Sequence, residues 1–176
     1  MEFLNFCQLL LVAGNETTTN LISNGVLALA EFPEEEQKLR RQPELSASAV
    51  EEVLRYDTPV QLTYRTTTRA VAIRGTTIPA ESKVALLWGC ANRDPAVFPA
   101  PERFDITRSP NQHVAFASGI HYCLGAPLAR LEMRLTMETL MRRMRSLAID
   151  TEKGYQRIDN PLLRGMQRMP LVFEPA

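Results

Sequence analysis

One cysteine in the last third of the chain has the surroundings of a reactive or metal-binding thiolate. Cys123 lies between Gly119 and Gly125, which let the backbone bend sharply and let a flat ligand approach closely. A helical pattern begins directly after Gly125. The sulfur is therefore expected near a helix N-terminus, where exposed N–H groups and the helix dipole stabilise the thiolate that binds a metal or acts as a nucleophile.

Two other interpretations of this cysteine remain open from the residues alone. A free cysteine is usually a small buried hydrophobic residue. A zinc site formed by His113, His121, Cys123 and Cys90 is the second alternative, although their spacing matches no familiar zinc motif. Outside such a site, His113 is expected to be a packed or capping residue.

Composition and charge limit the class of protein. Of the 176 residues, 45% are hydrophobic and 23% are charged, as in an ordinary soluble globular protein. Lys plus Arg and Asp plus Glu both number 20, so the net charge gives no argument for a nucleic acid or an anionic membrane as partner. The apolar run at residues 9 to 13 is too short to span a bilayer. The three cysteines are far apart and odd in number, which favours a reducing compartment, with the cytoplasm as the default.

A long helix is expected at the beginning of the chain. Residues 2 to 31 contain no proline, and only Glu2 and Glu16 are charged before Glu31. A helix that is apolar nearly all round must be buried on all sides, and the rest of the chain offers little helical material to cover it. The sequence therefore indicates part of a larger folded unit.

The remaining pattern predicts shorter helices, a small sheet and an irregular connector. Helical periodicity recurs at residues 34 to 41, 46 to 56 and 126 to 145. Strand patterns predict a mostly antiparallel module, at residues 62 to 68, 71 to 73, 76 to 78 and 83 to 88, with later strands at 147 to 150 and 171 to 174. The fold class is thus mainly α with a small β-sheet module, in one domain or part of one over residues 1 to 176.

The residues around the cysteine resemble the haem-ligand signature of the cytochrome P450 family. Residues 116 to 125 read Phe-x-x-Gly-x-His-x-Cys-x-Gly, and they depart from the family at Ala117, where a second glycine is more usual. The resemblance implies that Cys123 is the proximal thiolate ligand of haem iron, in haem b, and that its electron donation favours O–O cleavage. It also implies haem contacts from the same segment, namely Phe116, Gly119, His121 and Gly125.

Residues 13 to 18 resemble the oxygen-activation motif of the same family, Ala-Gly-x-Glu-Thr-Thr. There the small residues, here Ala13 and Gly14, make room over the haem. Thr17 would donate a hydrogen bond and Glu16 would relay protons from solvent, so both are expected to be catalytic. The alternative is a polar stripe on an otherwise packed helix.

Glu52 and Arg55 match a third motif, Glu-x-x-Arg. Their spacing alone predicts a surface ion pair worth roughly a few tenths of a kcal/mol. The resemblance implies instead a buried pair, closed into a triad by Arg103 from a later loop. A carboxylate between two guanidiniums would lock the connector that supports the cysteine.

The resemblance also implies residues for the haem propionates and the substrate. Arg65 lies where the family has an arginine that reaches a propionate, a role suited to a guanidinium; a solvent-facing strand residue is the alternative. His121 would donate a hydrogen bond to a propionate. The implied substrate-lining positions lie in three separate segments, at Ala13, Gly14, Val60, Gln61, Thr63 and Met166.

Taken together, the motifs imply the carboxyl-terminal, haem-binding half of a soluble, bacterial-type cytochrome P450, without its amino-terminal half. Its activity would be insertion of one oxygen atom from O2 into a small hydrophobic organic substrate. NAD(P)H would supply electrons indirectly, through a ferredoxin or flavodoxin-like donor. The donor is expected on a basic outer face of the last helix, formed by Arg130, Arg134, Arg142, Arg143 and Arg145. The alternative function is a non-catalytic or vestigial haem-binding protein.

Overall fold

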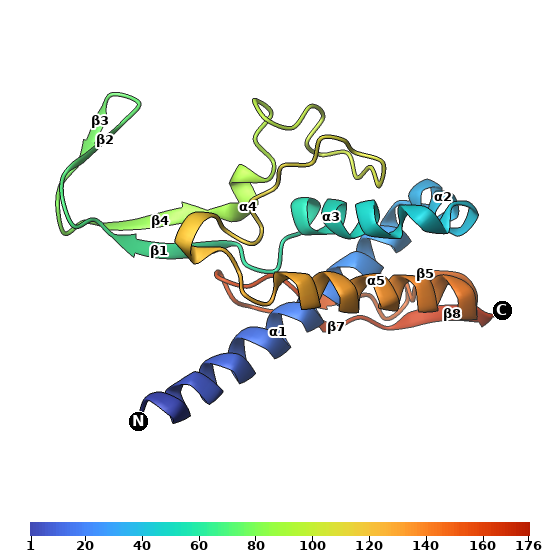
Figure 1. Cartoon of the computed structure of the whole chain (residues 1–176). Coiled ribbons are helices and arrows are strands. Elements are labelled where there is room, and N and C mark those ends of the chain that lie inside the picture. The colour runs from blue at the N-terminus through green and yellow to red at the C-terminus, as the bar shows by residue number, and fades with distance from the viewer.

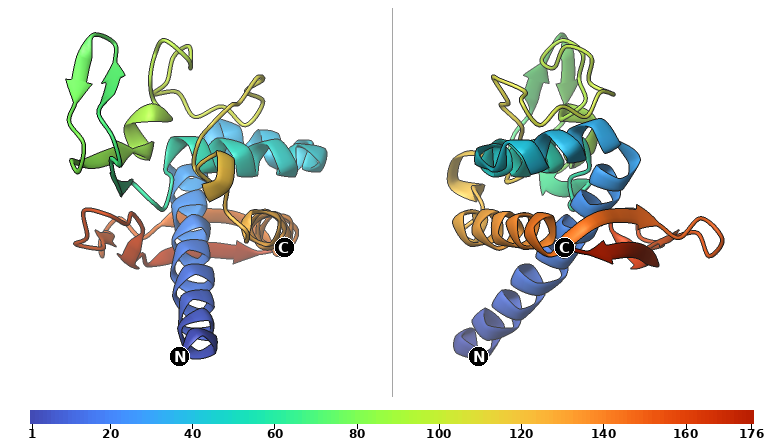
Figure 2. Two further views of the ribbon diagram at one scale, coloured as in Figure 1. Left: turned by 60° about the vertical axis from the view of Figure 1, so that its left-hand side comes forward. Right: turned by 90° about the vertical axis from the view of Figure 1, so that its right-hand side faces the viewer.

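A long helix forms the axis of the molecule, which a computed structural model describes over residues 1–176. Helix α1 spans Glu2–Glu31, as the sequence predicts. Its C-terminal third lies in the core beside α3 (Ser46–Tyr56) and α5 (Ala126–Arg143) (Figure 1). Its first half projects from the other elements (Figure 2). The large apolar side chains of this half are exposed. The apolar surface of α1 is therefore covered only towards its C-terminal end.

The core lies where α1, α3 and α5 meet. Helix α5 approaches α1 so closely that a Cβ atom at Gly25 would lie 2.0 Å from Met133 Cε, so the side chain of any other residue would displace Met133. Helix α2 (Pro33–Arg41) and a 3₁₀ turn, η1 (Pro43–Leu45), join α1 to α3. Twelve buried residues form the core: Leu21, Ala28, Leu29, Leu39, Ala49, Val50, Val53, Leu54, Phe104, Ile106, Met133 and Met137.

Helix α5 contacts the core through two methionines. Met133 and Met137, one turn apart, are buried because they fill the space beside Gly25. A stripe of leucines at helical spacing is exposed instead, at Leu124, Leu128, Leu131 and Leu135. The outer face of α5 therefore carries this apolar stripe in addition to the arginines that the sequence predicts there.

The first four strands form two separate antiparallel pairs. β1 (Leu62–Thr66) pairs with β4 (Lys83–Leu87), and β2 (Val71–Ile73) pairs with β3 (Thr76–Ile78). The second pair is a hairpin that extends far from the helices (Figure 1). The strand positions agree with the prediction, but the pairs do not join into one sheet.

The last four strands also form two antiparallel pairs. β5 (Met144–Ile149) pairs with β8 (Leu171–Pro175), and β6 (Gln156–Arg157) pairs with β7 (Met166–Arg168). Helix α5 ends earlier than predicted because Met144 already pairs with Pro175. β6 and β7 lie where the sequence analysis expects no strands.

A connector without long regular elements leads from the strands to the cysteine. It begins at the short helix α4 (Trp88–Ala91) and reaches a single 3₁₀ turn, η2 (Gly119–His121). Glu52 and Arg55 of α3 hold it, and both are fully buried. Arg55 donates to Glu52 at 2.8 and 2.9 Å and to the carbonyl oxygens of Asn92, Pro101 and Arg103 at 3.1, 2.9 and 3.0 Å. The pair is thus not a surface ion pair.

The third member of this buried cluster is Arg108, and the expectation that Arg103 fills this place was wrong. Arg108 Nε donates to both Glu52 oxygens at 3.2 Å. The Arg103 side chain is 66% exposed and reaches only Asp105, at 4.0 Å. Arg103 contributes its backbone instead, because its carbonyl oxygen accepts hydrogen bonds from both Arg55 and Arg108.

The connector turns into the cysteine segment at a strained residue. Ala117 has a φ of 58°, in the left-handed region, and its N–H donates to Val114 O at 2.9 Å. Two residues later, Gly119 has a φ of 63°, which costs little because glycine has no Cβ atom to clash with the backbone. Gly125 needs no such freedom, since its φ is −82°. The sharp bends predicted around the cysteine therefore lie at Ala117 and Gly119.

Neither α1 nor any other helix combines the length and apolar character needed to cross a bilayer.

Replacement of the two arginines should separate their roles. Arg108→Ala is expected to lower the free energy of unfolding by about 2 kcal/mol, because it removes charged hydrogen bonds from a buried carboxylate. Arg103→Ala, the matched control, should change it by less than about 0.5 kcal/mol. Glu52→Ala should cost about 3–5 kcal/mol, since it strands a buried guanidinium. Urea unfolding measures all three, and a larger loss for Arg103→Ala than for Arg108→Ala would contradict this assignment.

Ala117→Gly should stabilise the protein. A residue with a Cβ costs about 1–2 kcal/mol in the left-handed region, and glycine loses part of this gain through unfolded-state entropy. A net gain of about 0.5–1 kcal/mol in the free energy of unfolding is expected. Ala115→Gly is the control, because Ala115 has no positive φ, and it should destabilise. Equal losses in both variants would show that Ala117 is not strained.

Candidate functional site

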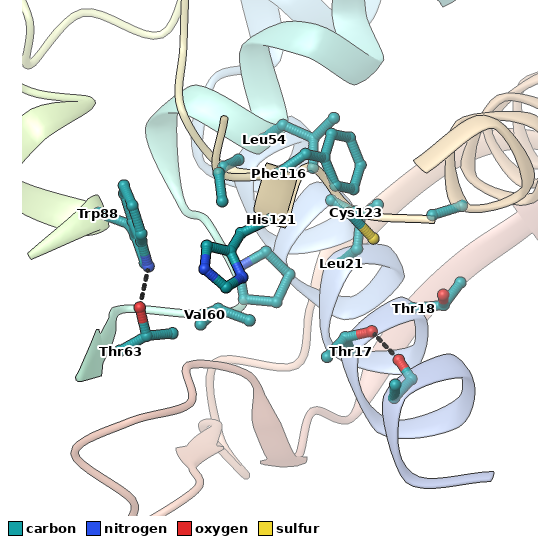
Figure 3. Close-up of a pocket in the computed structure, with 15 residues that line it drawn as sticks. Thr17, Thr18, Leu21, Leu54, Val60, Thr63, Trp88, Phe116, His121 and Cys123 are labelled. Carbon is teal, nitrogen blue, oxygen red and sulfur yellow. Dashed lines mark hydrogen bonds between the residues drawn. The ribbon is translucent and has the colours of Figure 1, made fainter. Parts of the chain in front are cut away.

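The predicted cysteine faces an apolar pocket between α1, β1 and residues 112 to 125, which we call the cysteine loop (Figure 3). The pocket has a volume of about 260 Å³, and 10 of its 15 lining residues are hydrophobic. Five residues line it from the cysteine loop: Ala115, Phe116, Ala117, His121 and Cys123. The other ten lining residues come from five further segments, namely α1, α3, residues 59 to 63, α4 and α5: Ala13, Thr17, Thr18, Leu21, Leu54, Pro59, Val60, Thr63, Trp88 and Ala129.

Backbone hydrogen bonds fix the position of Cys123. Its N–H donates to Phe116 O at 3.0 Å, which closes the cysteine loop on itself. Its own carbonyl oxygen accepts from Ala126 N–H at 3.3 Å, at the first residue of α5. The thiol is partly exposed and free. The prediction of a cysteine beside a helix N-terminus therefore agrees with the structure.

Helix α1 contributes a hydroxyl and a carbonyl group to the same pocket. Thr17 Oγ1 donates to Ala13 O at 2.8 Å (Figure 3), and both residues line the pocket. A threonine that bonds back to the preceding turn tends to bend a helix and draws the carbonyl towards its own hydroxyl. Glu16 is exposed and does not line the pocket. The structure thus brings Thr17 and Ala13 together with Cys123, and leaves Glu16 in contact with solvent.

Several predicted residues lie outside the pocket lining. Arg65 donates to the carbonyl oxygen of its neighbour Tyr64 at 2.8 Å, and Gln61 donates to Thr58 O at 2.6 Å. Gly14, Met166, Gly119 and Gly125 do not line the pocket either. Val60 and Thr63 do, so the predicted substrate segment is divided between the pocket and its surroundings.

Some lining residues were missed by the sequence analysis. Trp88 Nε1 donates to Thr63 Oγ1 at 3.0 Å, and this pair closes one side of the pocket (Figure 3). Trp88 is the single tryptophan of the chain, which could have drawn attention to it. Leu21 and Leu54 belong to both the core and the pocket wall. Only the packing of α1 against α3 brings them there, and no local pattern signals it.

The contact of Arg130 and His113 with Glu51 was also missed. Arg130 of α5 donates to both carboxylate oxygens of Glu51 at 2.7 and 2.8 Å. His113, only 3% exposed, lies 3.0 Å from the same carboxylate. Burial alone would raise the pKa of Glu51, but hydrogen bonds from Arg130 and His113 outweigh it and lower the pKa to about 2. The hydrogen bond to Glu51 raises the pKa of Arg130.

The donor set fits haem better than a zinc ion. No group of three or more His, Cys, Asp or Glu side chains gathers anywhere in the chain, so the residues considered for a zinc site do not converge. A single thiol beside apolar walls suits a metal that arrives with other ligands of its own, as iron does in a porphyrin. His121 adds one polar group that could meet a propionate. The residues present therefore fit haem.

Comparison with known proteins gives the same family. The cytochrome P450 family model matches residues 1–169. The biotin biosynthesis cytochrome P450 of Bacillus subtilis is 48% identical over 176 residues, which cover 98% of this chain and 44% of that protein.

Two crystal structures show the corresponding fold. P450BioI bound to an acyl carrier protein that carries hexadec-9Z-enoic acid superposes with a TM-score of 0.91 at 47% identity, over 96% of this chain and 43% of that one. CYP109E1 from Bacillus megaterium with corticosterone gives a TM-score of 0.94 at 40% identity, over 98% and 46%. This chain spans less than half the length of these relatives. It belongs to the cytochrome P450 family.

Proposed function

We propose that this chain is the haem-binding, carboxyl-terminal part of a single-domain bacterial P450 monooxygenase, in which Cys123 is the iron ligand. One observation carries the proposal: the Cys123 thiol and the Thr17 hydroxyl line the same apolar pocket from two elements that are far apart in the sequence. Haem bound there would supply an iron whose thiolate ligand favours cleavage of the O–O bond of O2. The expected reaction is insertion of one oxygen atom into an organic substrate.

The chain's own residues divide the remaining tasks. Thr17 holds a hydroxyl proton at Oγ1, currently directed to Ala13 O, and can redirect it into the pocket by rotation of χ1. Glu16 is exposed, so its carboxylate can exchange protons with water. Apolar residues such as Phe116 and Leu54 limit access of water to the pocket.

Two residues are proposed to bind the haem propionates. His121 already lines the pocket and has no hydrogen-bond partner in it. Arg65 would have to leave the Tyr64 carbonyl to reach a carboxylate, an exchange that gives a guanidinium a charged acceptor in place of a neutral one.

The substrate and the electron donor are proposed from the chemistry of two surfaces. The pocket is mainly apolar, which suits a small hydrophobic substrate, and the fatty acyl chain and the steroid in the two related structures are largely apolar as well. An acidic ferredoxin or flavodoxin-like protein would bind on the cysteine side, and NAD(P)H would reduce that partner. Arg130 and Arg134 are paired with Glu51 and Glu138, so the partner would meet the later arginines, at Arg142, Arg143 and Arg145. A cytoplasmic location remains a prediction.

The exposed apolar surface supports the proposal that a further part of the domain is needed. The first half of α1 and the leucine stripe of α5 are both exposed, and a stable monomer rarely exposes so much contiguous apolar surface. In the experiments below, the term "completed protein" means this chain joined to an amino-terminal part that precedes residue 1. That part can come from coding sequence upstream of Met1 or from the Bacillus subtilis relative. The alternative is a haem-binding protein without activity, which the same exposed surface favours for the chain alone.

The ligand is tested by substitution of cysteines in the completed protein. Wild type should give the strongly red-shifted Soret band of thiolate-ligated haem in its reduced carbon monoxide complex. Cys123→Ala and Cys123→His should abolish this band, because no other cysteine reaches the pocket. Cys90→Ala is the matched control and should retain it, since Cys90 is an exposed thiol outside the pocket. Retention of the band in either Cys123 variant would end the proposal.

The need for a further part is tested with the 176 residues alone. After addition of haemin, this chain is expected to aggregate or remain partly molten because its apolar surfaces are uncovered. Size-exclusion chromatography, haem stoichiometry and NAD(P)H-coupled product formation with a surrogate ferredoxin system measure the outcome. A monodisperse, haem-loaded chain that hydroxylates a substrate would refute the need for the missing part. Haem binding without product would favour the alternative function.

A further inference from the structure

We propose that Arg130, oriented by Glu51, is a positioning residue that holds Cys123 in the geometry for thiolate ligation. The inference rests on the proposed function, because it concerns the same cysteine. It assigns a role to an ion pair that neither contacts the pocket's reacting groups nor belongs to the three motifs of the sequence.

The guanidinium of Arg130 contacts two residues of the cysteine loop that hold the backbone of Cys123. Its Nη1 donates to the hydroxyl oxygen of Tyr122 at 3.0 Å, and Tyr122 is the residue before Cys123. Its Cζ lies 4.6 Å from the centre of the Phe116 ring, within the range of a cation–π interaction. Phe116 supplies the carbonyl oxygen that accepts from Cys123 N–H. One side chain thus contacts both the residue that precedes Cys123 and the residue whose carbonyl oxygen accepts from Cys123 N–H.

The part of the cysteine loop next to Cys123 has few other side-chain restraints. Ile120 is 98% exposed and Leu124 is 86% exposed, so the residues on either side of Cys123 gain almost nothing from burial. The loop also includes the strained Ala117. A loop with weak packing and a strained backbone needs a directional restraint to keep one geometry.

Glu51 provides that restraint by fixing the guanidinium itself. A bidentate contact holds the plane of Arg130 in one orientation, which leaves Nη1 directed to Tyr122. His113 Nδ1 accepts a hydrogen bond from Ala115 N–H at 3.3 Å, so Nε2 carries the proton and donates to Glu51 Oε2. Because the pKa of Glu51 is about 2, the carboxylate stays ionised at any pH at which the enzyme would work. The pair is a permanent clamp rather than a pH switch.

The test compares variants of the completed protein by spectra of the haem-loaded fraction. The reduced carbon monoxide complex separates haem with a thiolate ligand from haem with a neutral thiol, which gives a less red-shifted band. Arg130→Gln and Glu51→Gln should each raise the ratio of the neutral-thiol band to the thiolate band about tenfold, the usual effect of removing a partner that orients a metal ligand. The reduction potential of the iron should rise with it, because a thiolate stabilises the oxidised iron more than a thiol does.

Controls distinguish positioning from a general loss of stability. The double variant should be no worse than Arg130→Gln alone, because the two residues act as one unit. Arg134→Gln should keep the wild-type ratio, since Arg134 lies one turn later, is half-exposed and forms only a 3.7 Å pair with Glu138. Arg130→Lys keeps the positive charge but cannot form the bidentate contact with Glu51, so it should give an intermediate ratio. Tyr122→Phe removes one hydrogen bond and should have a smaller effect in the same direction.

Each outcome decides between the two proposals. A wild-type ratio and potential in haem-loaded Arg130→Gln would overturn the positioning role and leave the function intact. If that variant binds no haem, the ratio is read from Arg130→Lys and Tyr122→Phe, and wild-type values in both would overturn it equally. Absence of the thiolate band from the wild-type completed protein would instead refute the proposed function.

Discussion

The buried carboxylate of Glu52 is the interaction on which the rest of the site depends. Residues 92 to 118 have almost no regular secondary structure, so their backbone groups need partners outside a helix or sheet. Arg55 and Arg108 supply hydrogen bonds to several carbonyl oxygens of this connector, and Glu52 lies between the two guanidiniums and compensates one of their two charges. Asp105 N–H also donates to Glu52 at 2.9 Å. The ionic cluster around Glu52 thereby satisfies backbone groups of the connector, as a neighbouring strand does in a β-sheet.

The site combines this connector with a helix of very different character. Helix α1 is continuous, and it places Thr17 and Ala13 by its own hydrogen bonds. The cysteine loop is irregular and depends on side chains from α3 and α5. A cofactor between them would therefore meet one fixed wall and one wall whose geometry is set by ion pairs. Substitutions remote from the pocket are thus expected to affect the loop wall first.

Local patterns predicted the helices, most strands and the cysteine segment, because each depends on residues close together in the sequence. The long helix α1 was predicted from thirty residues without proline. The hairpin strands were predicted from short strand-like patterns bounded by turn residues. The errors concern partners chosen by tertiary packing. Arg103 and Arg108 are both arginines on one loop, and only the path of the backbone decides which side chain reaches Glu52. The buried methionines of α5 likewise depend on the close approach at Gly25.

The same limit explains the missed parts of the pocket and of its support. Leu54, Trp88 and Arg130 lie on separate elements, and no spacing rule links them to Cys123. Glu51 directly precedes a recognised motif residue, yet it points to a different partner, since adjacent helical residues face different directions.

The large sequence separation between Arg55 and its hydrogen-bond partners affects the order in which the chain folds. Its carbonyl partners lie 37 to 48 residues later in the sequence, so their hydrogen bonds close long loops. Loop closure of this kind adds entropy loss that local helices do not incur, which slows the formation of such contacts. Helices α1 and α3 can therefore form before the connector has a fixed path. The cysteine comes after the connector in the chain and should reach its final position last. Uptake of a prosthetic group would then coincide with the final step of folding, and the group itself would be one of the contacts that completes it.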